Sequence, residues 1–145
     1  AVFTPHPGEL ARLMGVTPQT INADRIGAGR SFIEKYGAHL LLKGARSILF
    51  GPAGEMVINP TGNAALAKGG SGDILTGFIG GLVAQGYQLT EAAVLAAYIH
   101  GYIADTWVEN GIDLDMLACD LLDGVGKAIQ EIRDGKDRVY IERSL

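Results

Sequence analysis

The chain has 145 residues, with 12 Lys and Arg against 16 Asp and Glu, a formal charge of −4 and 48% hydrophobic residues. This length favours one domain or part of a larger one, with enough apolar material for a core. The single cysteine, Cys119, excludes an intrachain disulfide and a cysteine-based zinc site, which is typical of a reducing compartment such as the cytoplasm. The sequence has no basic cluster of the kind that binds nucleic acid, and no apolar stretch approaches the roughly 20 residues of a membrane span. We therefore expect neither nucleic acid nor a membrane as a partner.

Helices and short strands alternate in the first part of the chain. Gly15 closes an apolar stripe at helical spacing, and Thr17 before Pro18 is a cap followed by proline at the first helical position. Residues 39–42 are almost wholly apolar, which is typical of a strand buried on both faces of a sheet. Residues 51–54 carry the glycine and proline of a hairpin turn. The elements expected here are the end of a strand in residues 1–5, helices over 9–14 and 18–36 with a break near 27–29, and strands over 39–42, 47–50 and 56–59.

Helices dominate the second part of the chain. A loop of small residues from 59 to 73 contains several glycines and leads into an apolar helix expected over 74–85. Thr90 is expected to cap a further helix to about residue 108, another is expected from Asp115 or a neighbour to about residue 133, and a last strand over 139–141. Strands separated by helices indicate an α/β domain in which helices cover a sheet, and nothing in the composition divides residues 1–145 into two domains.

The most informative segment is the run Lys-Gly-Gly-Ser-Gly-Asp at residues 68–73, directly before the apolar helix. Glycines permit positive φ, and consecutive N–H groups at a helix N-terminus form an anion site that the helix dipole reinforces. We expect Gly70, Ser71 and Gly72 to form an anion hole for a phosphoryl group. Asp73 is then a candidate general base for a hydroxyl that is being phosphorylated, or else an ordinary N-cap residue. The P-loop string and the GxGxxG string of dinucleotide sites are both absent from the sequence.

Four motifs occur in a fixed order: Thr-Pro-His-Pro-Gly-Glu at 4–9, Leu-Lys-Gly at 42–44, Asn-Pro-Thr-Gly-Asn at 59–63, and Gly-Gly-Ser-Gly-Asp-Ile-Leu-Thr-Gly at 69–77. With them the chain resembles the ADP/ATP-dependent NAD(P)H-hydrate dehydratase family, a branch of the ribokinase-like superfamily. The resemblance implies a layered α/β fold of the ribokinase-like type, with helices packed on a mostly parallel sheet. It also implies that residues 1–145 are the C-terminal portion of one such domain and that the N-terminal part is missing.

The resemblance further implies a lyase that repairs damaged nicotinamide cofactor. In this family a nucleotide phosphorylates the ring hydroxyl of hydrated NADH or NADPH, and phosphate is then eliminated. The expected small molecules are NAD(P)H hydrate, ADP or ATP as phosphate donor, and Mg²⁺ that accompanies the phosphates. The expected protein partner is a second copy in a homo-oligomer or a complementary N-terminal fragment. Because the N-terminal part is missing, the isolated chain is expected to be inactive.

Individual residues match the family's functional positions. Asp73 matches the expected base and substrate contact, and His6 matches a second substrate contact. The positions that match the nucleotide site are Lys43, Gly44, Ala45, Arg46, Ser47 and Gly72, with Asn59 and Asn63 in a neighbouring loop. His39 and His100 have no partner at metal-ligand spacing and are interpreted as structural, so no residue is assigned to a metal.

Two other functions remain open at this point. A ribokinase-like kinase for a vitamin precursor carries a similar glycine-rich segment that ends in aspartate, and it would release a stable phosphorylated product. A catalytically silent nucleotide-binding fragment would keep the loops without turning over substrate.

Overall fold

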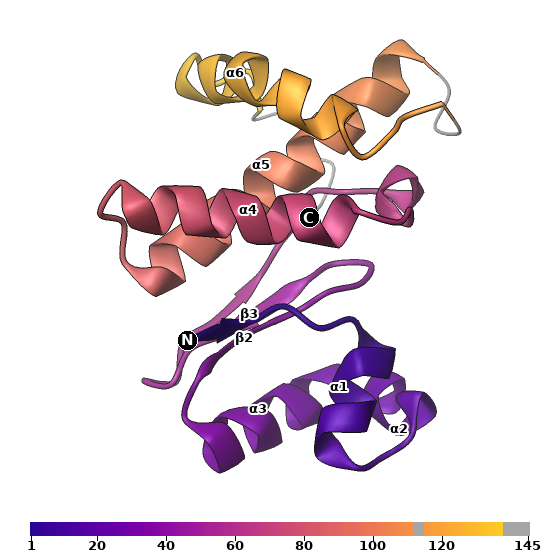
Figure 1. Cartoon of the computed structure of the whole chain (residues 1–145), viewed down its shortest axis with the longest axis vertical. Helices are drawn as coiled ribbons and strands as arrows, with labels where there is room; N and C mark the ends of the chain where they lie inside the picture. The colour runs from indigo at the N-terminus through magenta and orange to yellow at the C-terminus, as the bar shows by residue number, and fades with distance from the viewer. Residues whose placement is uncertain (112–114, 138–145) are drawn as a thin grey trace.

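A four-stranded sheet separates two groups of helices in the computed structural model, which describes residues 1–111 and 115–137 (Figure 1). The strands lie side by side in chain order: β1 (Val2–Phe3), β2 (His39–Leu42), β3 (Ile48–Phe50) and β4 (Met56–Ile58). β1 and β2 are parallel, whereas β2–β3 and β3–β4 are antiparallel. The expected layered α/β fold is confirmed, but the described sheet is mixed and not mostly parallel. The reason is local: short turns at residues 43–47 and 51–55 reverse the chain, and only a longer crossover produces a parallel neighbour.

Both faces of β2 and β3 are buried, as the apolar runs predict. Leu40 and Leu42 pack with Phe50 against the first group of helices. Leu41 and Leu49, which point to the opposite face, pack against the second group. Since successive strand residues alternate between faces, a wholly apolar strand is what a sheet covered on both sides requires.

The first group of helices covers one face with α1 (Pro7–Met14), α2 (Pro18–Ala23) and α3 (Arg25–Tyr36) (Figure 1). The expected helix 18–36 is broken at Asp24 and not near residues 27–29, because the Asp24 carboxylate accepts a hydrogen bond from the Gly27 N–H and caps α3. Gly29 lets the Phe50 ring pack closely against α3, because a Cβ atom at this position would lie 2.2 Å from the ring.

The second group contains a 3₁₀ turn η1 (Ala64–Leu66) and helices α4 (Ser71–Ala84), α5 (Leu89–Asn110) and α6 (Asp120–Arg133). α4 and α5 lie on the sheet, and α6 packs on their outer side (Figure 1). α4 begins three residues earlier than predicted, at Ser71. α5 is capped by Gln88 with Glu91, while the predicted cap Thr90 hydrogen-bonds His39 Nε2 at 3.0 Å. The predicted strand 139–141 lies outside the described residues.

The parallel pairing of β1 and β2 decides where the site forms. The carboxyl ends of parallel strands meet at one edge of a sheet, the usual ligand edge of α/β folds. The chain leaves β1 toward His6 and leaves β2 at Lys43, and the Lys43 N–H donates to the Pro5 carbonyl at 2.9 Å. Two motifs that are far apart in the sequence therefore become neighbours.

Candidate functional site

Two adjoining cavities, of about 670 and 540 Å³, lie at this edge of the sheet. The larger is lined by the turn after β2, the loop at 59–67 and α5. The smaller is lined by the end of β1, the start of α1 and the N-terminal turn of α4. Four residues line both cavities: His6, Lys43, Lys68 and Gly72.

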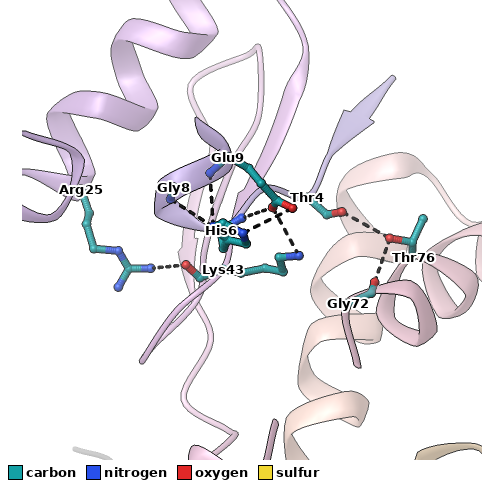
Figure 2. Close-up of polar contacts among 8 residues, drawn as sticks. All are labelled: Thr4, His6, Gly8, Glu9, Arg25, Lys43, Gly72 and Thr76. Carbon is teal, nitrogen blue, oxygen red and sulfur yellow. Dashed lines mark hydrogen bonds and ion pairs between the residues drawn. The ribbon is translucent and has the colours of Figure 1, made fainter. Parts of the chain in front are cut away.

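His6 caps helix α1 with its ring. Its Nδ1 atom accepts hydrogen bonds from the N–H groups of Gly8 and Glu9, at 3.0 and 3.2 Å (Figure 2). Because both partners are donors, Nδ1 carries no proton in the neutral ring and Nε2 carries it. The Glu9 carboxylate accepts from the His6 N–H at 2.7 Å and lies 3.4 Å from Nε2. His6 thus enters the site in one tautomer, with an N–H donor on Nε2.

Glu9 also reaches Lys43, whose Nζ lies 3.8 Å from Glu9 Oε2 (Figure 2). The hydrogen bond from the His6 N–H lowers the pKa of Glu9, and the charge of Lys43 adds to this effect. Glu9 is therefore a carboxylate that connects a residue of the β1 end with one of the β2 end. The sequence reasoning quoted Glu9 within a motif but gave it no role. The available signal was its position three residues after the cap, the second half of a capping box.

Lys43 lies over the N-terminus of α4. The helix starts after Gly70, which has φ 89° and is its N-cap. A Cβ atom on Gly72 would lie 2.8 Å from Lys43 Nζ, so only glycine leaves the ammonium group its place. An ammonium group beside the positive end of a helix dipole is an arrangement that attracts phosphate. Of the expected anion hole, Gly70 lines the smaller cavity, Ser71 the larger and Gly72 both.

Asp73 is exposed and lines the smaller cavity, as does His6. It occupies the third position of α4, and the N-cap is Gly70, so the alternative of an N-cap aspartate is wrong. The end of β1 is tied to the same helix turn, because Thr4 and Thr76 share a hydrogen bond of 3.3 Å and Thr76 donates to the Gly72 carbonyl (Figure 2).

The expected nucleotide residues divide into two groups. Lys43, Gly44, Ala45, Ser47 and Gly72 line the larger cavity. Arg46 is not among the described residues that line either cavity, and it adopts a left-handed backbone with φ 59°.

The loop at 59–63 forms a wall of the larger cavity and is fixed on α5. Asn59 donates to the carbonyl of Ala97 at 3.1 Å, and the Gly62 N–H donates to Asp105 at 2.8 Å. Burial raises the pKa of Asp105, although both hydrogen bonds that it accepts, the second from Asn63, oppose the rise. The side chains of Asn59 and Asn63 thus hold the wall in place through hydrogen bonds to α5.

His100 takes part in the same wall. It is buried, lines the larger cavity, and donates from Nε2 to the Ser71 carbonyl at 3.0 Å. Burial lowers its pKa to about 4, so the ring is neutral near pH 7. Sequence reasoning treated His100 as structural. The structure shows that this structural bond holds the start of α4 at the cavity.

The described residues contain no group of three His, Cys, Asp or Glu side chains placed to hold a metal ion. None of the helices in that part of the chain has the length and apolar character needed to cross a bilayer.

Comparison with known proteins gives one consistent result. The sequence profile of the NAD(P)H-hydrate dehydratase family matches residues 1–127. A bifunctional NAD(P)H-hydrate repair enzyme of Moorella thermoacetica is 44% identical over 133 residues, 92% of this chain and 25% of the relative. An ADP-dependent (S)-NAD(P)H-hydrate dehydratase of Neisseria meningitidis is 45% identical over 118 residues, 81% of this chain and 40% of the relative.

Among solved structures, the ADP/ATP-dependent NAD(P)H-hydrate dehydratase of Bacillus subtilis, co-crystallized with ATP/Mg²⁺, matches with a TM-score of 0.87 and 34% identity. The match covers 90% of this chain and 47% of the Bacillus chain. The chain thus spans between a quarter and about half the length of these relatives. The resemblance inferred from the four motifs is confirmed, and the chain belongs to the NAD(P)H-hydrate dehydratase family.

Proposed function

We propose that this chain supplies the phosphate-binding and proton-accepting part of a nucleotide-dependent NAD(P)H-hydrate dehydratase. One observation carries the proposal: Lys43 lies over Gly72 at the start of α4, at the junction of two cavities, and Asp73 follows on the side of the smaller one. A cation, a helix N-terminus and a carboxylate at one junction are the parts that phosphoryl transfer requires.

In this proposal the nucleotide occupies the larger cavity, with its phosphates toward Lys43 and Gly72. The donor is ADP or ATP, in keeping with the names of the Neisseria and Bacillus relatives. Mg²⁺ in such sites is held largely by phosphate oxygens and water, and it would enter with the nucleotide. The ion would neutralise charge on the phosphates.

The hydrated nicotinamide ring occupies the smaller cavity, between His6 and Asp73. Asp73 accepts the proton of the ring hydroxyl while the hydroxyl oxygen attacks the terminal phosphorus atom of the nucleotide. The bond between that phosphorus atom and the bridging oxygen of the nucleotide then breaks. His6 contributes a donor on Nε2 that orients the hydrate. In the second step the ring C–O bond breaks, phosphate leaves with the bonding electrons, and loss of a ring proton restores the double bond of NADH or NADPH.

The remaining contacts of the site would come from outside the chain. Since the chain matches 47% of the Bacillus structure, we expect a complementary N-terminal part or a further copy to complete the smaller cavity. With a single cysteine, the chain suits the cytoplasm, which we retain as the proposed compartment.

The test is ADP-dependent recovery of the near-ultraviolet absorbance of reduced nicotinamide from hydrated NADH, with phosphate measured in parallel. The chain is assayed alone and with the N-terminal part of a family domain. Asp73→Asn should lower turnover by roughly 10² to 10⁴-fold while ADP still binds. Asp123→Asn, in the first turn of α6, is the matched control and should change nothing.

The products separate the alternatives. Released phosphate together with recovered absorbance supports the dehydratase. A stable phosphorylated product from a vitamin precursor would instead support the kinase and contradict the dehydratase. Absence of turnover in both preparations would leave a silent nucleotide-binding fragment.

A further inference from the structure

Arg25 lies directly behind the turn that carries the nucleotide residues. It begins α3, in the first group of helices, and its guanidinium group reaches the end of β2 (Figure 2). Nη1 donates to the Ala45 carbonyl at 2.7 Å, and Nη2 donates to the carbonyls of Leu42 and Lys43 at 3.1 and 3.4 Å. Arg25 itself does not line the larger cavity, whereas Lys43 and Ala45 do. The guanidinium group therefore holds the turn from the side opposite the ligand.

This contact fixes the direction of the peptide groups. In a planar trans peptide the carbonyl and the following N–H point in opposite directions. Carbonyls of Lys43 and Ala45 that face Arg25 therefore turn the N–H groups of Gly44 and Arg46 away from it, and of these two residues Gly44 lines the larger cavity. The Gly44 N–H has no backbone acceptor in the part of the chain that the structure describes.

The backbone of the turn is adapted to this contact at two positions. Gly44 has φ 148°, and a Cβ atom there would lie 3.0 Å from Arg25 Nη2, so glycine is needed for the close approach. Arg46 has φ 59°, a conformation that costs a residue with a side chain on the order of 1 kcal/mol and persists only when neighbouring contacts impose it. The bond from Arg25 to the Ala45 carbonyl lies directly beside that strained residue.

Fold stability alone gives a poor account of Arg25. Its Nε atom is buried without a hydrogen-bond partner in the described structure, which is costly for a charged group. The hydrogen bonds from Nη1 and Nη2 go to main-chain carbonyls at the end of β2 and in the turn that follows it. A partly buried guanidinium group whose hydrogen bonds all go to residues 42–45 is explained if the shape of that segment matters.

We propose that Arg25 is a positioning residue for phosphate binding. It holds the turn 43–47 so that Lys43 Nζ and the Gly44 N–H face the larger cavity. The effect of Arg25 on nucleotide affinity rests on the proposed function, because that function places the nucleotide in the larger cavity. The effect of Arg25 on the shape of the turn does not depend on the proposed function.

The test uses the 145-residue chain, labelled with ¹⁵N, in four forms: wild type, Arg25→Met, Arg25→Lys, and Arg30→Met as the control. Arg30 is an exposed arginine on the same helix. Amide spectra report the turn, ADP titrations report affinity, and thermal unfolding reports global stability. Arg25→Met should shift or broaden the amide signals of residues 43–47 and weaken ADP binding about tenfold or more, the range expected for losing charge-assisted hydrogen bonds. Arg25→Lys keeps a cation but loses the fork, so it should give smaller changes of both kinds, and it serves if Arg25→Met does not fold.

Each outcome decides the matter. Changes confined to residues 43–47, with partial rescue by lysine and an unchanged Arg30→Met, support the positioning role. Spectra of residues 43–47 that stay the same in both Arg25 variants would overturn it, and so would unchanged ADP affinity beside a wild type that binds. Equal loss of order throughout α3 and β2 would show a general structural role and also overturn it. If the wild type binds no ADP, the proposed function fails, while the amide signals still decide whether Arg25 shapes the turn.

Discussion

Replacing Gly72 by alanine should separate the anion site from the stability of the fold. The added Cβ atom would lie 2.8 Å from Lys43 Nζ, which forces the ammonium group to move. Nζ is the end of a flexible side chain, and its pair with Glu9 is partly exposed, so losing that pair costs under about 1 kcal/mol. Alanine in a helix recovers up to about 1 kcal/mol relative to glycine. The free energy of unfolding should therefore change by less than about 1 kcal/mol in either direction.

The effect on binding should be much larger. An ammonium group displaced from the start of α4 no longer donates to a phosphate there, and a hydrogen bond to a charged group contributes about 1.5–3 kcal/mol. The dissociation constant for ADP should therefore rise roughly 10- to 150-fold. Calorimetric titration with ADP and urea unfolding measure the two quantities. Gly77→Ala, on the same helix with open space at its Cβ position, is the control and should keep wild-type affinity. Unchanged ADP affinity in Gly72→Ala, beside a wild type that binds, would refute the placement of phosphate between Lys43 and α4.

Two further predictions concern the groups behind the site. Burial lowers the pKa of His100 from 6.5 to about 4, so the unfolded chain binds more protons between these values. The free energy of unfolding should be highest above pH 6.5 and fall by about 3 kcal/mol as the pH drops toward 4. In His100→Gln, urea unfolding should show little of this loss. Equal slopes of the unfolding free energy against pH in both proteins would contradict the prediction. Gly29→Ala forces a Cβ atom into the Phe50 ring and should destabilise the fold by about 1–3 kcal/mol. Gly126→Ala, with open space, should not destabilise it, and equal melting temperatures for the two alanine variants would show that the Phe50 contact is unimportant.

The sequence predicted the helices and strands well where apolar spacing or a cap is local. Residues 39–42 form the buried strand, and Gly15 and Gly37 end helices in the left-handed conformation. Helix starts were less predictable. The break at Asp24 was missed because an aspartate cap competes with a more obvious pair of glycines, and Gly29 turned out to serve packing on Phe50. The hairpin of β3 and β4 was predicted from its turn and is confirmed, whereas the antiparallel pairing of β2 with β3 was missed, because a mostly parallel sheet was expected where the short turn at 43–47 reverses the chain.

The site was predicted as a set of residues without its internal connections. Motifs and glycines pointed to His6, Lys43 and Asp73, which line neighbouring cavities. Glu9 and Arg25 were given no role, because an acidic residue at a helix start and an arginine at another are common features of any sequence. Their roles depend on which groups they reach in the folded chain. Glu9 pairs with the side chain of Lys43, 34 residues away, and Arg25 reaches the carbonyl of Ala45, 20 residues away.

The amino-acid sequence by itself determined the family, the α/β character and the candidate residues of the site, because these depend on residue type and on spacing within a few turns of chain. Only the tertiary structure decided that the start of α1, the turn after β2 and the N-terminus of α4 meet. That meeting follows from the parallel pairing of β1 with β2 and from α4 packing on Leu41 and Leu49 of the sheet. Burial of apolar surface selects this arrangement among many that local sequence permits, and it brings the cation, the helix end and the carboxylate to one junction.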